Sequence, residues 1–262
     1  MIKTSNYLPF VVKPNLWPHL YRITRRKIGR LIYNDVDINE LNEISRMQSE
    51  SYCKENMVDI EKALKTLNIK ENSEDFYKNY KDVLAESEKE TEKCPHKLGG
   101  AANLPLLYQI TESIQAKKVI ETGVAYGWSS LSILLSISKR NDSKLWSIDL
   151  PYVSFDNSKW VGCAVPSFLN SYWKLMRYAD RDGLPKAISE AKSVDLVHYD
   201  SDKTIEGRLF AYPLIWETLR EGGILISDDI GDNMAFAYFC KKTNKKPIII
   251  KDSNKYQGIL IK

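Results

Sequence analysis

Cysteine is sparse in this sequence and is not arranged for a metal site or a disulfide framework. The chain has 262 residues and four cysteines, Cys53, Cys94, Cys163 and Cys240, none of which forms a CxxC pair. Zinc ribbons and disulfide-rich folds need cysteines at short, paired spacings. We therefore expect free, buried thiols.

Long apolar runs are also missing. No stretch approaches the roughly 18 apolar residues of a membrane span, and the N-terminus lacks the apolar segment of a secretory signal. The hydrophobic share of 43% and the charged share of 27% are typical of a soluble globular protein with a full-sized core. We expect a cytoplasmic protein of one large domain, or of one domain with an appendage. The net charge of +4 is too mild to indicate a nucleic-acid partner.

The first hundred residues lack apolar strands and are rich in Glu and Lys. Residues 13–33 carry six Lys or Arg residues and no acid, with apolar residues at a roughly helical period. Such a helix could lie on an anionic membrane surface, but packing on its own domain or on a partner subunit is favoured. Residues 37–93 predict two or three further helices. We assign residues 1–97 to a helical cap or a segment for homodimerisation.

The remaining residues, 98–262, alternate between short apolar runs and helical patterns. This alternation predicts an α/β fold, in which a parallel sheet carries helices on both faces. Ligands of such sheets bind at the carboxyl ends of the strands. The predicted strands are 117–123, 144–150, 173–180, 194–200, 222–229, 246–252 and 257–262, and the predicted helices are 103–116, 128–140, 184–192, 204–220 and 233–243.

The turn after the first predicted strand, VIETGVAYGWSS (residues 119–130), lacks both common phosphate-binding signatures. The lysine of a P-loop is missing, and the two glycines, Gly123 and Gly127, are spaced Gly-x-x-x-Gly rather than GxGxxG. Glu121 would repel a phosphate but suits a ligand with hydroxyls or positive charge. S-adenosylmethionine (SAM) has an ammonium, a sulfonium and a ribose and no phosphate, and glycines let the backbone approach it closely. We expect Glu121 near the methionyl end of this ligand and Ser129 near the start of the next helix.

Two further acids end the second and third predicted strands. Asp149 occupies the place where an acid binds ribose hydroxyls in the dinucleotide fold; its alternative role is to cap a loop. Asp180 ends the third predicted strand, where it could reach an adenine amino group or serve as a turn or cap residue.

These motifs, in this order, resemble the class I SAM-dependent methyltransferases. VIETGVAYGWSS is similar to their first motif, LWSIDLP to their second-strand acid motif, and VDLVHYDSDKTIEGR with LREGGILISDDI to their fourth and fifth strands. The likeness is to the methyltransferase 24 subgroup and, more distantly, to macrocin-type sugar and catechol O-methyltransferases. It implies a Rossmann-like, seven-stranded, mostly parallel sheet with an antiparallel edge hairpin, outside which lies the N-terminal helical extension. The cofactor-binding residues that follow are Glu121, Gly123, Tyr126, Gly127, Ser129, Asp149 and Asp180.

Three acids are expected to meet beside the SAM site. Asp200 ends the fourth predicted strand, and Asp228 and Asp229 end the fifth, so their carboxylates repel unless they are protonated or neutralised by a cation. Mg²⁺ prefers such oxygen ligands and could lower the pKa of a substrate hydroxyl. The metal-dependent relatives resembled above carry an acid at the Asp200 position and an Asp-Asp or Asp-Asn pair at the Asp228–Asp229 position. In the alternative, one acid caps the following helix, another binds substrate, and no metal is involved.

Three residues are candidates for the base that deprotonates the acceptor. Asp202 matches the base position of the sugar-modifying relatives, and Lys203 matches the lysine of the catechol type. A cluster of acids would raise the pKa of a lysine, which favours Asp202 or a supporting charge role for Lys203. Strand alternation points His198 to the same side as Asp200; its alternative is a buried structural histidine.

The long insertion at residues 151–172 is typical of a lid. Its aromatic residues Tyr152, Phe155 and Trp160 are expected to cover the cofactor or acceptor, or to pack against the N-terminal helices. Gly99 and Gly100 are candidates for another wall of the site, and Asn233 for a polar contact with substrate.

The sequence therefore predicts a SAM-dependent O-methyltransferase that acts on a small polar hydroxyl compound, such as a sugar or glycan component, with Mg²⁺ as a candidate second cofactor. A nicotinamide-dependent oxidoreductase is the first alternative, and the missing GxGxxG argues against it. A non-catalytic SAM-binding protein is the second. Nucleic-acid methylation is disfavoured, because HYDSDK stands where a base-flipping Asn-Pro-Pro-Tyr motif would lie.

Overall fold

The computed structural model of the chain contains a seven-stranded sheet, as expected. It describes residues 13–32, 38–69, 73–101, 103–151 and 156–262, without the side chains of residues 26–32 and 38–42. The strand order is β3-β2-β1-β4-β5-β7-β6. Pairing is parallel from β3 to β5, whereas β7 runs antiparallel to both β5 and β6, which confirms the edge hairpin. The strands are β1 (Lys118–Thr122), β2 (Lys144–Ile148), β3 (Trp173–Met176), β4 (Val194–Tyr199), β5 (Leu219–Ser227), β6 (Ile248–Asp252) and β7 (Lys255–Ile261).

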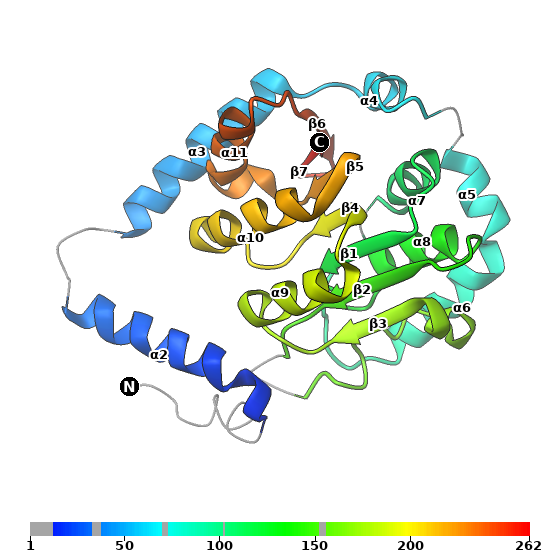
Figure 1. Cartoon of the computed structure of the whole chain (residues 1–262), viewed down its shortest axis with the longest axis horizontal. Coiled ribbons are helices and arrows are strands. Elements are labelled where there is room, and N and C mark those ends of the chain that lie inside the picture. Colours follow the sequence, from blue (N-terminus) through cyan, green and yellow to red (C-terminus); the bar gives the residue numbers. More distant parts are fainter. Residues whose placement is uncertain (1–12, 33–37, 70–72, 102, 152–155) are drawn as a thin grey trace.

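Helices cover both faces of the sheet (Figure 1). Successive strand residues point to opposite faces, so Val119 of β1 belongs to one apolar core and Ile120 to the other. The first core packs under α7 (Leu104–Ser113) and α8 (Trp128–Ile137). The second packs under α9 (Asp180–Ala191), α10 (Ile205–Thr218) and α11 (Ala235–Thr243). Short 3₁₀ turns lie at η2 (Pro14–Leu16), η3 (Ser167–Tyr172) and η4 (Ile230–Asp232).

The third strand is shorter than predicted, so Asp180 belongs to a helix instead of a strand. Strand β3 ends at Met176, and Asp180 is the first residue of α9 rather than the last residue of a strand. Asp180 and Asp182 lie in the first turn of this helix, where the helix dipole favours negative charge. Asp180 still lies at the carboxyl edge of the sheet.

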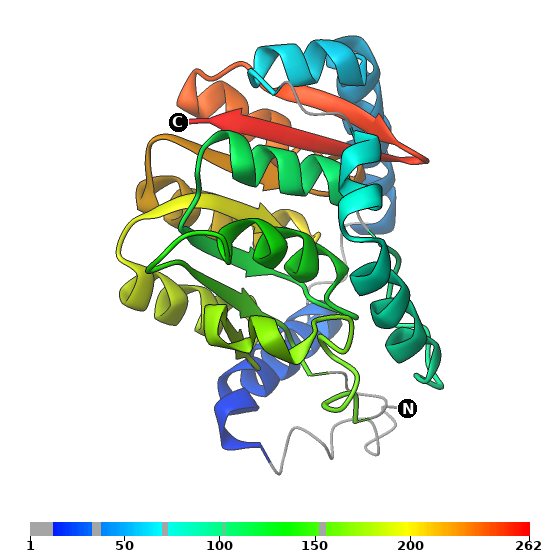
Figure 2. The same cartoon turned by 90° about the vertical axis from the view of Figure 1, so that its right-hand side faces the viewer.

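Four helices, not two or three, occupy the described part of residues 37–93: α3 (Ile38–Asn56), α4 (Ile60–Thr66), α5 (Ser73–Asn79) and α6 (Lys81–Glu92). Helices α5 and α6 are separated by Tyr80, whose ring packs against Phe76 and Tyr108. Tertiary packing thus outweighs helix propensity there. Figure 2 shows α3 and α4 beside the β6 edge and α5 and α6 along one side of the domain.

The basic helix α2 (Trp17–Ile32) packs on its own domain through its described residues. It contacts α9, where the Arg22 guanidinium pairs with the Asp182 carboxylate. None of the helices within the described ranges combines the length and apolar character that crossing a membrane requires.

Candidate functional site

A cavity of about 820 Å³ follows the carboxyl ends of the strands. Its size lies within the roughly 300–1,000 Å³ of small-molecule sites. The walls come from the turns after β1, β2, β4 and β5, the start of α9, the β6–β7 hairpin and α2. The predicted wall at Gly99 and Gly100 is part of this lining. The sheet therefore presents its cavity at the edge where such folds bind ligands.

Gly123 is required at the floor of the cavity because the chain from β4 crosses directly over it. Its φ is +82°, and a Cβ there would lie 2.1 Å from the carbonyl oxygen of Asp200. Gly127 has φ +91° and directly precedes α8 as its N-cap residue, and a Cβ there would lie 2.9 Å from the Cα of Gly162. Only glycine adopts this backbone readily and leaves this room. Of the two, Gly123 lines the cavity.

Glu121 lies beneath the cavity and does not line it. Its carboxylate is fully buried and accepts hydrogen bonds from the hydroxyls of Ser129 at 2.6 Å, Ser130 at 2.5 Å and Ser147 at 2.7 Å. Burying a carboxylate is costly unless it is hydrogen-bonded, so these serines account for its place. In this arrangement Glu121 joins β1, β2 and α8, and its predicted place near the methionyl end of SAM stays a prediction.

We expect Glu121→Gln to destabilise the domain, because a side-chain amide would present two donors to a site built from donors. Leaving buried groups unsatisfied costs about 1–3 kcal/mol, and urea unfolding should show a loss within that range. Ser130→Ala, which removes one of the three donors, should cost less. Equal stability of Glu121→Gln and the wild type would contradict a structural role for this carboxylate.

Asp149 lines the cavity and is held in one orientation. Its Oδ2 accepts from the backbone N–H of Val124 at 2.9 Å and of Ala125 at 3.2 Å, and its Oδ1 pairs with Arg177 at 2.7 Å. Burial raises the pKa of Asp149, and the Arg177 charge partly opposes this. The carboxylate thus fixes the glycine turn, and its predicted contact with ribose hydroxyls stays a prediction.

Asp180 also lines the cavity, next to the turn after β4. Its Oδ2 accepts from the Ser201 hydroxyl, and burial raises the pKa of Asp180 to about 6. Ser129 lines the cavity, although its hydroxyl serves Glu121. Tyr126 does not line the cavity, and its hydroxyl donates to the carbonyl of His96.

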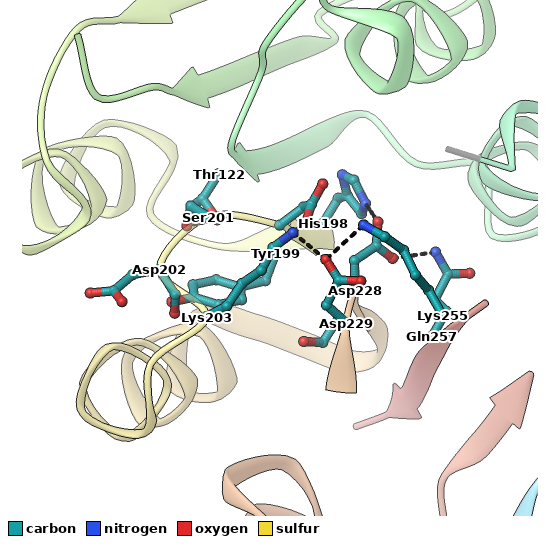
Figure 3. Close-up of polar contacts among 12 residues, drawn as sticks. Thr122, His198, Tyr199, Ser201, Asp202, Lys203, Asp228, Asp229, Lys255 and Gln257 are labelled. Atoms are coloured by element: carbon teal, nitrogen blue, oxygen red, sulfur yellow. Dashed lines mark hydrogen bonds and ion pairs between the residues drawn. The ribbon is translucent and has the colours of Figure 1, made fainter. Parts of the chain in front are cut away.

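The three predicted metal ligands come together, but each already has a cationic or donor partner (Figure 3). The Lys203 ammonium lies 3.0 Å from Asp200 Oδ1 and also contacts Asp229 Oδ2. The two oxygens of Asp228 accept from His198 Nε2 at 3.2 Å and from Gln257 Nε2 at 2.5 Å. Among the described residues, no cluster of three or more His, Cys, Asp or Glu side chains is arranged to hold a metal ion. The residues present therefore do not fit the predicted Mg²⁺.

The three candidate bases lie in different surroundings. Asp202 lines the cavity, but its Oδ1 accepts from the backbone N–H and the hydroxyl of Thr204, at the start of α10. Burial works against the charge of Lys203, yet the Asp200 carboxylate raises the pKa of this lysine, as expected. His198 is fully buried and does not line the cavity. Burial opposes protonation of its ring, but Asp228 raises the pKa of His198 to about 10.

The structure bears on two further expectations. Asn233 does not line the cavity; its side chain donates to the Lys203 carbonyl at 2.8 Å and accepts from the Ala235 N–H. Within residues 151–172, Tyr152 and Phe155 lie outside the described residues, and no described residue, including Trp160, lines the cavity. Instead, the N–H groups of Gly162 and Ala164 bond to the turn at Ala125 and Tyr126. The described part of this insertion covers the glycine turn from outside.

Sequence reasoning missed four residues of the site. Arg177 directly follows β3 and pairs with Asp149, but the predicted strand 173–180 had placed it inside the strand. Lys255 and Gln257 belong to β7, and Arg22 belongs to α2. Their positions depend on contacts between distant parts of the chain, which no local pattern indicates.

The sequence of this chain matches a family of known methyltransferases. Residues 120–230 match the methyltransferase 24 family model, described as a methyltransferase domain. No curated protein sequence matches the chain. The resemblance to class I SAM-dependent methyltransferases is thereby confirmed, and the matched segment runs from β1 to η4.

Several solved structures share the fold. An O-methyltransferase from Streptomyces achromogenes, TomG, involved in tomaymycin synthesis and solved with SAM, is 16% identical with a TM-score of 0.51, covering 76% of this chain and 94% of its own. An O-methyltransferase from Bacillus cereus in complex with SAH is 12% identical with a TM-score of 0.53, covering 80% and 100%. A methyltransferase from Geobacter sulfurreducens is 17% identical with a TM-score of 0.52, covering 69% and 89%. These likenesses confirm the Rossmann-like methyltransferase fold.

Proposed function

We propose that this chain, which carries a class I SAM-dependent methyltransferase domain of the methyltransferase 24 type, transfers the methyl group of SAM to a hydroxyl of a small polar molecule. The observation that carries the proposal is one cavity that joins Gly123 and Asp149 to Asp200 and Lys203. The first pair suits an adenosyl ligand, and the second suits a hydroxyl that must lose its proton. Methyl transfer needs both in one space, because nucleophile, methyl and sulfur have to align.

Asp200 is the carboxylate best placed to take the acceptor proton. Its side chain is 33% exposed and lines the cavity, whereas His198 is buried and Asp202 is engaged at the start of α10. Burial and then the neighbouring Asp228 raise the pKa of Asp200, which makes it a stronger base than an ordinary carboxylate. The protonated Lys203 lies beside it and would stabilise the developing alkoxide.

The acceptor side of the cavity favours a molecule with several hydroxyls, such as a sugar or glycan component. Asp252, Ser253 and Gln257 of the β6–β7 hairpin line this side together with Lys203. Carboxylate, hydroxyl and amide groups are the partners that fix polyhydroxy ligands by hydrogen bonds. A panel of sugars and small phenols, with release of S-adenosylhomocysteine (SAH) as the readout, tests this choice. Turnover of phenols with no turnover of sugars would contradict it.

Helix α2 supports the proposal as a wall of the cofactor end of the cavity. His19, Arg22 and Ile23 line the cavity beside Ala179 and Asp180. The ion pair between Arg22 and Asp182, whose side chains are 28% and 19% exposed, holds the helix against α9. We infer that α2 acts as a cap over the bound cofactor.

We expect Arg22→Ala to weaken SAM binding about fivefold, because one partly buried ion pair contributes about 1 kcal/mol. The measurement is the SAM dissociation constant from calorimetry. Arg25→Ala is the matched control, since Arg25 lies one turn further along α2 and does not line this cavity. Equal weakening by the two variants would argue against the α2 wall.

A further inference from the structure

Lys255 gives the acid cluster a second cation that comes from the chain itself, in addition to Lys203. It is the first residue of β7, and its ammonium lies 3.0 Å from Asp229 Oδ2, the oxygen that Lys203 also contacts. Figure 3 shows the two lysines approaching Asp229 from different sides. Asp229 is only 7% exposed, and its backbone has a positive φ of 52°.

The backbone of this turn is itself anchored. The fully buried Arg208 donates from Nη2 to the carbonyl oxygens of Asp228 at 3.0 Å and of Asp229 at 2.7 Å. Asn233 holds the Lys203 carbonyl at 2.8 Å. The backbone that carries Asp229 and the backbone that carries Lys203 are therefore both anchored by buried side chains.

The same contacts use four of the six carboxylate oxygens that could ligate a divalent cation, which are Asp200 Oδ1, both oxygens of Asp228 and Asp229 Oδ2. Mg²⁺ requires oxygen ligands at about 2.0–2.1 Å in near-octahedral geometry. Both oxygens of Asp228 accept hydrogen bonds, and Oδ2 of Asp229 meets two ammonium groups. A divalent ion at this place would have to displace both lysines or lie against their like charges.

We propose that Lys203 and Lys255 are the resident cations of this acid cluster, so that the site takes its positive charge from the chain instead of from a divalent metal ion. The proposal deepens the proposed function, on which its catalytic meaning rests. Within it, Lys203 lies beside the base Asp200 and faces the acceptor oxygen. Lys255 is a positioning residue, because it shares the charge of Asp229 and leaves Lys203 directed toward Asp200.

The test is to convert the cluster into a metal site. Mn²⁺ is titrated into the wild type and into the double variant Lys203→Met/Lys255→Met, and free Mn²⁺ is followed by its paramagnetic resonance signal. The wild type should leave Mn²⁺ free, whereas the double variant should bind one Mn²⁺ per chain at least about tenfold more tightly, because the carboxylates lose both resident cations. Lys251→Met is the control, since it removes an exposed lysine of the same hairpin that stacks over Tyr256.

Two results would overturn the proposal. One is a wild type that binds one Mn²⁺ per chain and loses it on Asp229→Asn. The other is a folded double variant with the Mn²⁺ affinity of the wild type. If the double variant fails to fold, the single variant Lys255→Met is tested instead, because its side chain is 68% exposed and its loss should not prevent folding. A gain in Mn²⁺ affinity of this variant supports the proposal, and no gain opposes it. SAH calorimetry on the wild type distinguishes failure of the proposed function from failure of the lysine proposal. A wild type that does not bind SAH would contradict the proposed function, whereas the lysine proposal would still be decided by the Mn²⁺ titration.

Discussion

Gly123→Ala should abolish most of the cofactor affinity of this chain. An alanine at φ +82° is strained, and its Cβ would lie 2.1 Å from the Asp200 carbonyl oxygen, so either the glycine turn or the chain after β4 has to move. Strain of this kind costs about 1–3 kcal/mol, and the shift displaces both the cofactor floor and Asp200. We expect SAH binding to weaken by about 30-fold or more in calorimetry, where each 1.4 kcal/mol is tenfold.

Gly100→Ala provides the matched control. Gly100 lines the same cavity, but a Cβ there would meet no atom within 4 Å. Its SAH affinity should stay within about twofold of the wild type. Thermal unfolding of Gly123→Ala is measured in parallel, to show that the loss concerns a folded domain. If the two alanine variants bind SAH equally well, the ligand does not lie on the glycine turn.

Asp200→Asn should have the largest effect on turnover. The amide keeps the shape of the side chain but cannot accept the acceptor proton, and removal of a general base typically costs about 10²–10⁴-fold in rate. SAH affinity should change much less than the rate, because the proposed base acts on the acceptor. In the wild type, activity should fall as pH drops through the pKa of Asp200, which burial and Asp228 raise above the usual carboxylate value.

Asp232→Asn is the control for this experiment. Asp232 belongs to η4 and does not line the cavity, and its change to Asn keeps the size of the side chain. Its rate should remain within about threefold of the wild type. A turnover of Asp200→Asn that matches Asp232→Asn would show that another group removes the proton, and Asp202 would be the next candidate.

The residues whose position follows from strand order could be predicted from the sequence. Each parallel strand brings its carboxyl end to the same edge, so Asp149, Asp200, Asp228 and Asp229 were expected there, and the structure places all four along the cavity. The glycine spacing likewise predicted a tight turn before α8, and both glycines have positive φ.

The partners of these residues could not be predicted in the same way. The sequence shows the acid at Glu121 but not that three serine hydroxyls would enclose it below the cavity. Lys255 reaches Asp229 only because β7 pairs beside β5 in the sheet. The cavity wall from α2 depends on the packing of a helix more than a hundred residues away in the chain, which no local periodicity encodes.

The most direct test of the central claim is calorimetric titration of the full chain with SAH and, separately, with NAD. The cavity built from Gly123, Asp149 and Asp180 predicts binding of one SAH per chain, no heat with NAD, and competition of SAH by SAM. Binding of NAD without binding of SAH would contradict the account and would favour an oxidoreductase on the same sheet.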